Sequence, residues 1–365
     1  MAFYLPRPDR LYQILRFRRQ PSEIDVYMAR TILAEYGLEL LGEPRPSSGP
    51  GRSHSLTLST SQGKKLLKRY KHTVIVPTII HEHSILTYLA QVGFPAPRLV
   101  GTLTGDTCVR QGDRNYALFE FIEGGFQYHN CLLLPGQTRQ FISIAGQTLA
   151  TLHTWLEKLD PQGHNPHGFR SRTESWWRGL DWYADLLVKS KAEAARQPVH
   201  DGRNLPDELL KWTDYLGESL YQLGDRLEKT ALPRVIIHGD YGPYNLLFKP
   251  DKTATVLDFE IARLDWRATE LVDSLPRFCY NRWGFDLDKM RCFLAAYRAC
   301  SAVADDEWQL LPDIWTFLNV RRCIVNGYQY STTQDAQRLT QARWNLKLIE
   351  WMAENRSVFL SHLGA

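Results

Sequence analysis

The residue types best suited to chemistry lie between residues 235 and 260. Three apolar residues lead into a His-Gly-Asp triplet, so a buried strand is expected to deliver Asp240 to an exposed turn. Asn245 follows five residues later, and Asp258 ends a second apolar run. Carboxylate and amide oxygens at the mouth of neighbouring strands are ligands that a hard cation such as magnesium prefers. The pattern therefore indicates a magnesium site.

A predicted hairpin brings two of these residues together. Residues 246–248 are apolar, residues 249–252 are typical of a turn, and residues 253–257 are typical of a returning strand. A two-residue turn at 251–252 would make Asn245 and Asp258 cross-strand partners at the open end. The alternative is an ordinary strand exit at the His-Gly-Asp triplet, with Asp258 as a strand-end cap.

The spacing Asp240-x-x-x-x-Asn245, followed by Asp258 on a strand, resembles the phosphotransfer core of protein-kinase-like enzymes. The His-Gly-Asp triplet, with Asp-Phe-Glu where protein kinases have Asp-Phe-Gly, resembles the aminoglycoside phosphotransferase and choline kinase group. The resemblance implies that Asp240 orients or deprotonates an acceptor hydroxyl and that His238 supports it. It also implies that Asn245 and Asp258 hold Mg²⁺ against the phosphates of ATP, with GTP as the alternative nucleotide.

The elements around this core fit a two-lobed α+β fold. Residues 1–121 are expected to form a nucleotide-binding lobe, with a helical extension over residues 22–37 and one main helix over residues 77–93. Residues 122–365 are expected to form a helical catalytic and acceptor-binding lobe. An antiparallel sheet of five strands is expected in the first lobe, at residues 55–60, 65–70, 98–103, 107–111 and 115–121.

Lys68 is the candidate nucleotide-binding side chain of the first lobe. It falls on an otherwise apolar face of its strand, where a lysine needs an anionic partner. The resemblance makes Lys68 the lysine of the nucleotide phosphates and makes Glu82 the partner that positions it. The alternatives are that Lys68 snorkels at a sheet edge, that Lys65 or Arg69 takes its place in a shifted register, and that Glu82 is solvated.

Two backbone segments are further candidates for nucleotide binding. The loop 47–53 is rich in Gly, Pro and Ser and lies where kinase-like folds close over phosphates, so Gly51 and Ser53 are candidate contacts. A flexible hairpin tip is the alternative for this loop. In the related enzymes adenine binds a hinge backbone, and the resemblance places that hinge at Glu120, Phe121 and Ile122.

The second lobe carries the acceptor-site candidates. Asp273 is expected to support the loop of Asp240, and His153 is expected to pack in the core. Residues 161–205 are expected to be an irregular insertion or flap beside the acceptor site, with a helical patch around Trp182. Helices are expected at residues 138–156, 209–227, 286–299, 307–328 and 333–352. The candidate substrate contacts are Tyr241, Tyr244, Glu260, Arg277 and Tyr280.

Composition restricts the class of protein. The 365 residues suffice for two lobes, and a net charge of +4 with dispersed Lys and Arg predicts no nucleic-acid partner. Six cysteines without a Cys-x-x-Cys pair are typical of a reduced cytoplasmic protein without a zinc site. No apolar run is long enough to cross a membrane. A cytoplasmic monomer or dimer is expected.

Three functions fit these observations to different degrees. An ATP- and Mg²⁺-dependent kinase of a small-molecule hydroxyl is favoured, with an aminoglycoside, an amino alcohol, homoserine or a sugar as acceptor. A protein kinase is disfavoured because Gly239 replaces the Arg of His-Arg-Asp and no Ala-Pro-Glu segment follows Glu260. A pseudokinase that binds a nucleotide or a partner is disfavoured because Asp240, Asn245 and Asp258 are all present.

Overall fold

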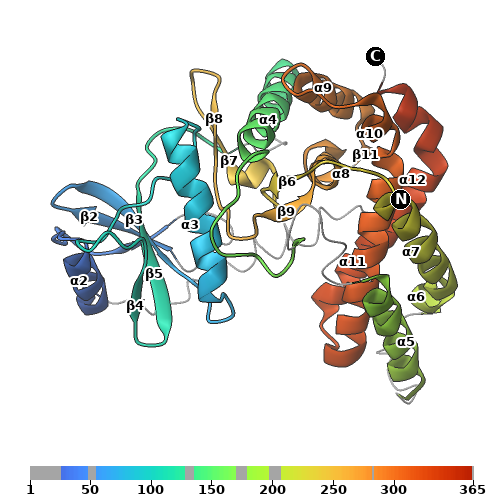
Figure 1. The fold of residues 1–365 in the computed structure, drawn as a ribbon, viewed down its shortest axis with the longest axis horizontal. Helices are drawn as coiled ribbons and strands as arrows, with labels where there is room; N and C mark the ends of the chain where they lie inside the picture. Colours follow the sequence, from blue (N-terminus) through green and yellow to red (C-terminus); the bar gives the residue numbers. More distant parts are fainter. Residues whose placement is uncertain are drawn as a thin grey trace.

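The computed structural model describes residues 26–47, 55–127, 135–169, 179–196, 207–281 and 283–363. Figure 1 shows a small lobe built on a sheet at one end and a larger helical lobe at the other, which confirms the expected α+β fold. The small lobe contains α2 (Val26–Glu35), β1 (Arg45–Pro46), β2 (Ser55–Thr60), β3 (Gly63–Arg69), α3 (Val76–Gln91), β4 (Val109–Gln111) and β5 (Arg114–Glu120).

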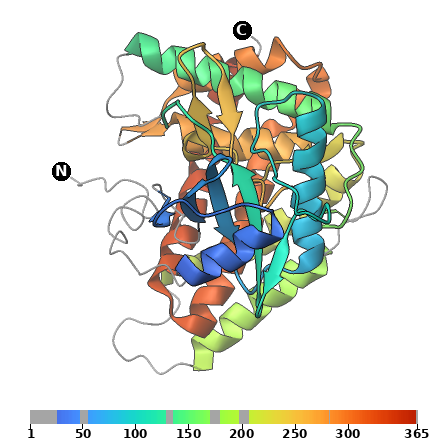
Figure 2. The same ribbon diagram turned by 90° about the vertical axis from the view of Figure 1, so that its left-hand side faces the viewer.

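The sheet of the small lobe has the order β1-β2-β3-β5-β4, and all its strands are antiparallel. Side chains alternate across β5, so Tyr116 and Leu118 pack with α2 while Ala117 and Phe119 pack with α3. Figure 2 shows α2 lying across the face of the sheet that it covers. Each helix therefore covers one face of the sheet.

One of the strands expected in this sheet does not form a continuous strand. Residues 98–103 form a single bridge, from Leu99 to Phe119, and Val100 donates to the Leu118 carbonyl at 2.8 Å. Strand β4 pairs with the same edge of β5 near residue 116. Residues 98–103 and β4 therefore each pair with only part of β5. The fifth strand is instead β1, which ends directly before the predicted loop 47–53.

The helical lobe is organised around α11, which packs against α5, α7, α8 and α12. Its helices are α4 (Pro135–Leu156), α5 (Leu180–Arg196), α6 (Asp207–Lys211), α7 (Thr213–Glu228), α8 (Arg267–Cys279), α9 (Leu287–Arg298), α10 (Asp305–Gln309), α11 (Leu311–Thr333) and α12 (Ala336–Ser361). Its short strands are β6 (Arg234–Ile237), β7 (Leu246–Phe248), β8 (Ala254–Val256), β9 (Arg263–Trp266), β10 (Tyr280–Asn281) and β11 (Gly284–Phe285).

Several of these helices differ from expectation. The helix expected at 209–227 is divided at Trp212 into α6 and α7, and α12 continues nine residues beyond the expected end at residue 352. The helical patch expected around Trp182 is confirmed as the start of the 17-residue helix α5, which covers more of the segment 161–205 than expected. Helix α8 was not anticipated, although Ala268, Leu271, Val272 and Leu275 follow helical spacing; nearly all its residues are buried, polar ones included.

The β7–β8 hairpin corrects the predicted register by one residue. Leu246 pairs with Val256, so Asn245 lies opposite Leu257, whose N–H donates to the Asn245 carbonyl at 2.8 Å. The loop closes between Lys249 and Thr253 and has three residues, not two, with Lys252 at a φ of +66°. Asn245 and Asp258 are therefore near one another along the hairpin mouth but are not cross-strand partners.

The segment that joins the lobes is fixed to this hairpin. Phe126 and Phe248 exchange backbone hydrogen bonds of 2.9 and 3.0 Å. Gly125 has a φ of +95°, and a Cβ there would lie 2.8 Å from the Phe248 carbonyl oxygen, so a glycine is required. The connection between the lobes thus begins at a defined position beside β7.

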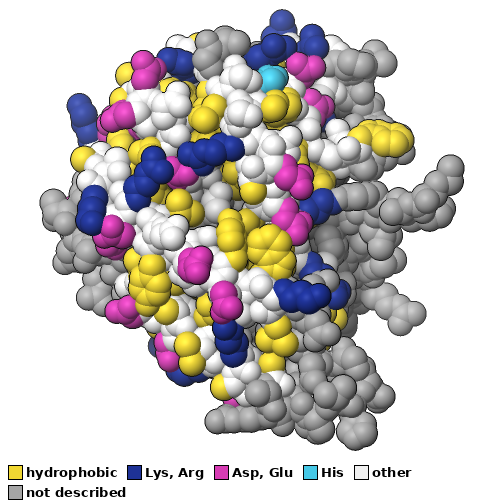
Figure 3. All heavy atoms as spheres, turned by 90° about the vertical axis from the view of Figure 1, so that its right-hand side faces the viewer, with side chains coloured by type: hydrophobic (Ala, Val, Ile, Leu, Met, Phe, Trp, Pro, Cys, Tyr) yellow, Lys and Arg dark blue, Asp and Glu magenta, His cyan; other side chains and the backbone are white. Residues whose placement is uncertain are grey.

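No helix in the described ranges is long and apolar enough to cross a bilayer. On the face of the helical lobe drawn in Figure 3, basic and acidic side chains are interspersed.

Candidate active site

Strand β6 and one glycine shape the loop that carries Asp240. The apolar residues of β6 are buried and pair with β9. Gly239 follows with a φ of +81°, and a Cβ there would lie 2.4 Å from Nη1 of Arg263 and 2.6 Å from the Ile261 carbonyl oxygen. No larger residue fits at position 239, which is the structural reason for His-Gly-Asp in this chain.

The carboxylate of Glu270, on α8, holds the backbone of this loop. Its oxygens accept hydrogen bonds from the N–H of His238 at 2.8 Å and of Gly239 at 2.6 Å. His153 contacts the same carboxylate through Nε2 at 2.9 Å. Burial opposes the charged form, but these partners outweigh it, and the pKa of Glu270 lies below its ordinary value. Asp273 was expected to provide this support; Glu270, one helical turn earlier, provides it instead.

His238 connects the two halves of the site. Its Nε2 donates to the Leu257 carbonyl at 2.8 Å, and its Nδ1 accepts from the Asp240 N–H at 3.2 Å. The imidazole therefore ties the loop of Asp240 to the residue that precedes Asp258. His153 is buried, as expected, and its Nδ1 lies 2.8 Å from the hydroxyl of Tyr297.

The carboxylate of Asp240 is held by three side chains. Its Oδ1 accepts hydrogen bonds from the Tyr244 hydroxyl at 2.6 Å and from Nη1 of Arg277. Its Oδ2 accepts from Nδ2 of Asn245 at 3.1 Å. About a third of the side chain is exposed (32%), so the carboxylate is oriented and still reachable from solvent. Of the predicted acceptor contacts, Tyr244 and Arg277 thus lie directly at Asp240.

Asp273 acts on this site through arginines. Its Oδ2 accepts from Nη2 of Arg277 at 2.8 Å and from Nη2 of Arg322 at 3.0 Å. Burial disfavours the charged carboxylate, but the two guanidinium groups outweigh it and hold the pKa of Asp273 well below its usual range. Asp273 therefore fixes Arg277 beside Asp240, and Arg322 adds a second cation there.

Asn245 and Asp258 retain oxygens suited to a cation. Nδ2 of Asn245 donates to the Asp240 carbonyl and carboxylate, which directs the amide nitrogen inward and leaves Oδ1 as the ligand atom. Asp258 has a φ of +62° and an exposed carboxylate. Burial of its surroundings opposes its charge, but the ammonium of Lys68 at 3.5 Å outweighs that effect and lowers the pKa of Asp258. An ionised carboxylate beside an amide oxygen fits Mg²⁺.

Lys68 lies at the boundary between the lobes. Its Nζ is 2.9 Å from Glu82 Oε1 and 3.5 Å from both Asp258 and Glu260. Burial disfavours the ammonium, but the carboxylate of Glu82 outweighs it and raises the pKa of Lys68 well above its usual value. Glu82 is only 3% exposed, so it is not a solvated surface residue. The expected Lys68–Glu82 ion pair is present.

The rival lysine and one acceptor candidate lie elsewhere. Lys65 pairs with Glu120 at 2.8 Å, away from Glu82. Glu260, predicted as an acceptor contact, lies instead with Lys68 and with Lys71, whose Nζ is 4.0 Å from it. Glu260 therefore lies beside Lys68, the lysine predicted to bind the nucleotide phosphates.

The hinge backbone is partly engaged. The N–H of Glu120 donates to the Arg98 carbonyl at 2.8 Å and the N–H of Phe121 to the Lys64 carbonyl at 3.4 Å. Neither of these two hydrogen bonds involves the N–H of Ile122, the third residue of the predicted hinge. Gly51 and Ser53, the predicted phosphate contacts, lie outside the described residues.

Two other acceptor candidates are placed differently from Tyr244. Tyr241 is 1% exposed and donates its hydroxyl to the Ala145 carbonyl at 2.7 Å, so it is a core residue and not an acceptor contact. Tyr280 packs edge-on against Trp344 of α12, with ring centroids 4.7 Å apart. Within the described part of the chain, no hydrogen bond links Tyr280 to Asp240.

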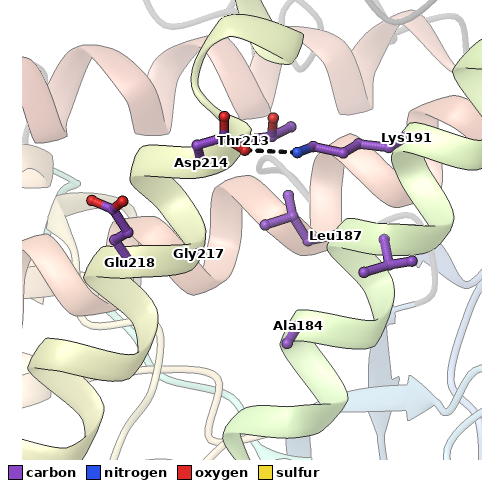
Figure 4. A pocket seen from close by; sticks show the side chains of 8 residues that line it. Ala184, Leu187, Lys191, Thr213, Asp214, Gly217 and Glu218 are labelled. Carbon is purple, nitrogen blue, oxygen red and sulfur yellow. Dashed lines mark hydrogen bonds and ion pairs between the residues drawn. The ribbon is translucent and has the colours of Figure 1, made fainter.

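A surface cavity lies apart from these residues. It opens between α5 and α7, and Figure 4 shows Lys191 and Asp214 paired across its rim at 2.8 Å. Its lining residues are Ala184, Leu187, Val188, Lys191, Thr213, Asp214, Gly217 and Glu218. None of them belongs to the loop of Asp240 or to the group of carboxylates around Lys68 (Glu82, Asp258 and Glu260).

Fold and site together define a two-lobed phosphotransferase of the protein-kinase-like kind. The model of the "Phosphotransferase enzyme family" matches residues 50–303, and the chain belongs to that family. The predicted resemblance is thereby confirmed. The enzyme is a small-molecule kinase whose acceptor is an alcohol group.

Individual relatives are distant but cover most of the chain. A homoserine kinase from Rhizobium rhizogenes (strain K84) is 24% identical over 310 residues, which are 85% of this chain and 87% of the relative. An aminoglycoside phosphotransferase from Alicyclobacillus acidocaldarius superposes with a TM-score of 0.63 at 21% identity and covers 96% of this chain and 98% of its own. A choline kinase from Streptococcus pneumoniae superposes with a TM-score of 0.52 at 13% identity, covering 86% and 94%.

Proposed function

We propose that this enzyme transfers the γ-phosphate of ATP to the hydroxyl of a small amino acid or amino alcohol in the presence of Mg²⁺. The observation that carries the proposal is the Asp240 carboxylate, oriented by Arg277, Tyr244 and Asn245 at the lobe boundary. Residues 1–121 form the nucleotide lobe of this proposal and residues 122–365 the catalytic and acceptor lobe.

Asp240 orients the acceptor hydroxyl in this proposal. Its Oδ1 is occupied by Arg277 and Tyr244, whereas among the described residues Oδ2 accepts only one bond, from Asn245 at 3.1 Å. Oδ2 is therefore the oxygen that accepts the hydroxyl proton of the acceptor. Because Arg277, Tyr244 and Asn245 fix the orientation of this carboxylate, we assign it chiefly to alignment of the hydroxyl rather than to early proton removal.

In this proposal, a bound metal ion and a lysine both supply positive charge opposite the nucleotide phosphates. Asn245 and Asp258 would hold Mg²⁺, which supplies charge neutralisation when bound. Lys68, positioned by Glu82, contacts a phosphate oxygen. The N–H of Ile122 and the backbone of Glu120 and Phe121 are assigned to adenine, and Gly51 and Ser53 to the phosphates by resemblance.

Homoserine is the acceptor that we infer first. Homoserine kinases are among the relatives that align with most of the chain. Arg277 contacts both Asp240 and Asp273, and Arg322 contacts Asp273, so two guanidinium groups belong to this cluster. This charge suits an acceptor that carries a carboxylate as well as an ammonium group, and suits a purely cationic acceptor such as choline less well.

An acceptor panel tests the proposal. The protein is incubated with ATP and Mg²⁺ and with homoserine, 3-aminopropanol, 4-hydroxybutyrate, choline, an aminoglycoside or a hexose, and phosphorylated product is detected by mass spectrometry. 3-Aminopropanol lacks the carboxylate of homoserine, and 4-hydroxybutyrate lacks its ammonium group. The relative yields of phosphorylated product from these two acceptors therefore show which charged group the enzyme recognises. Product from homoserine that disappears in Asp240→Asn supports the proposal. No product with any acceptor, from protein that binds ATP, would contradict it.

A further inference from the structure

A chain of buried polar groups extends behind the Lys68–Glu82 pair. Oε1 of Glu82 accepts from Lys68 at 2.9 Å, and Oε2 accepts from the Tyr70 hydroxyl at 2.8 Å. The same hydroxyl lies 2.9 Å from Nε2 of His83, and Nδ1 of His83 lies 2.7 Å from the Thr107 hydroxyl. Tyr70, Glu82 and His83 are each no more than 3% exposed.

The chemistry of these groups permits one direction of donation. An ionised carboxylate only accepts, so Tyr70 must donate its single proton to Glu82. Nε2 of His83 must then donate to the Tyr70 oxygen, which leaves Nδ1 as an acceptor for the Thr107 hydroxyl. Every group in the chain has a defined partner and role.

The electrostatic surroundings keep His83 and Tyr70 in the states that this direction needs. Burial, aided by the charge of Lys68, lowers the pKa of His83 to about 3, so the imidazole is neutral at physiological pH. Burial and the Glu82 carboxylate raise the pKa of Tyr70 well above its usual value, so its hydroxyl keeps the proton. Neither group changes state over the working range of a kinase.

Tyr70 contacts both members of the ion pair. Its hydroxyl bonds Glu82 on α3, and its ring lies under Nζ of Lys68, 4.8 Å from the ring centroid. Its own N–H donates to the Asn115 carbonyl at 2.9 Å, which fixes Tyr70 to the sheet. Tyr70 therefore joins the sheet to the helix that carries Glu82.

We propose that Tyr70, His83 and Thr107 are positioning residues that set the rotamer of Glu82 and, through it, the place of Lys68 at the nucleotide phosphates. The inference rests on the proposed nucleotide role of Lys68. Lys68 has two competing carboxylates at 3.5 Å, Asp258 and Glu260. With Glu82 released, Lys68 shifts toward Asp258 and neutralises a proposed metal ligand.

Removal of one hydroxyl tests the relay. Tyr70→Phe keeps the ring beneath Lys68 and removes only the bond to Glu82. A hydrogen bond to a charged group corresponds to roughly a tenfold change in affinity, so the Kd and KM for ATP-Mg²⁺ should rise by about that factor. The KM for the acceptor should stay unchanged. Tyr116→Phe is the matched control, because Tyr116 is a buried tyrosine of the same sheet whose hydroxyl contacts Met28.

Substitutions at His83 separate positioning from packing. His83→Leu removes the donor to Tyr70 and should reproduce the rise in the Kd for ATP, whereas His83→Gln keeps an amide donor and should restore most of the affinity. Thr107→Val removes the last hydroxyl with little change in shape and should give a smaller rise, about twofold to threefold. If Tyr70→Phe does not fold, the His83 and Thr107 variants still decide the question.

A double variant and direct binding distinguish the possible failures. Because contacting residues share one interaction, Tyr70→Phe should add little to the defect of Glu82→Gln. An unchanged Kd for ATP in Tyr70→Phe and His83→Leu, or equal rises in the KM for ATP and acceptor, overturns the relay. Nucleotide binding is measured by titration without acceptor, so a wrong acceptor assignment leaves this test intact. Absence of ATP binding by the unaltered protein would instead overturn the proposed function.

Discussion

The carboxylate of Asp240 is oriented before an acceptor arrives. Arg277 and Tyr244 hold Oδ1 and Asn245 holds Oδ2, while Glu270 fixes the backbone of the loop. Preorganised groups of this kind lower a barrier because little reorganisation is needed in the transition state. At the scale of single residues, the charge of the Asp240 carboxylate and its orientation should therefore contribute separately to the rate of transfer.

Asp240→Asn tests the charge while preserving the shape. The amide cannot orient or accept the hydroxyl proton as a carboxylate does, and groups of this kind contribute about 100- to 10,000-fold in rate. We expect kcat to fall within that range while the Kd for ATP changes little, as measured by steady-state kinetics and titration. A collapse of ATP binding with a normal rate per bound complex would make Asp240 a structural residue.

Asp258→Ala tests the metal assignment. The carboxylate is exposed and ionised next to Lys68, so its loss should abolish turnover with little effect on the fold. The measurement is the dependence of turnover on Mg²⁺ concentration. Asp251→Ala is the control, since Asp251 only closes the β7–β8 turn by accepting from the Thr253 N–H at 3.0 Å. Full activity in folded Asp258→Ala would refute the metal role.

At the scale of elements, helix α8 positions the residues of the site. Glu270, Asp273 and Arg277 follow one another along its length and reach the loop backbone, the arginine pair and Asp240. One helix thus orients both the backbone and the side chain of the catalytic loop. Its buried charged side chains Arg267, Glu270 and Asp273 each have a charged or backbone partner inside the lobe.

The Asp273 carboxylate predicts a pH dependence of stability. Its pKa is lowered in the folded state, so its contribution is complete above the unfolded pKa of about 3.9 and is lost as the pH falls further. Asp273→Asn removes the carboxylate that pairs with Arg322 and leaves Arg277 paired with Asp240 alone, and should cost about 3 kcal/mol at pH 7.

The measurement for Asp273→Asn is denaturant unfolding across a pH series. The free energies of unfolding of the variant and the unaltered protein should converge as the pH drops below about 4. Asp288→Asn is the matched control, because its ion pair with Arg291 is exposed and should contribute little at any pH. A constant difference between Asp273→Asn and the unaltered protein down to acid pH would contradict the assignment.

The sequence predicted the strands and motifs well, but not the supporting residues. Asp240 and Asp258 follow apolar runs and Asn245 precedes one, and this local pattern is sufficient to place them. Glu270 could not be chosen over Asp273, because the two carboxylates lie one helical turn apart and their partners, the Gly239 N–H and Arg322, are distant from them in the sequence. The hairpin register was wrong by one residue because Lys252 adopts a left-handed conformation that residue type does not announce.

At the scale of the whole molecule, the site depends on how the two lobes meet. Lys68 of the small lobe contacts Asp258 and Glu260 of the large lobe. On the other side, the N–H of His164 donates to the Pro77 carbonyl at the start of α3, at 3.3 Å. The loop around residue 163 therefore links the large lobe to the helix that carries Glu82.

Gly163 allows this approach, and its substitution tests whether lobe contact sets the nucleotide site. It has a φ of +71°, and a Cβ would lie 2.3 Å from the Pro77 carbonyl oxygen and 2.9 Å from the His81 nitrogen. Gly163→Ala should push α3 away and move Glu82. Gly93→Ala is the matched control, because Gly93 has a φ of +74° at the other end of α3 and a Cβ there meets nothing within 4 Å.

Both glycine variants should lose about 1 kcal/mol of stability from the left-handed backbone alone. Gly163→Ala should lose more, because its new methyl group meets backbone atoms that cannot move aside without shifting the helix. It should also raise the KM for ATP, which Gly93→Ala should leave near its original value, since only Gly163→Ala displaces Glu82 from Lys68. Unfolding free energies and ATP kinetics measured on both variants give the comparison. Identical behaviour of the two variants would show that the contact around residue 163 does not position α3, and that the sheet and the Tyr70 bond are enough to hold Glu82 in place.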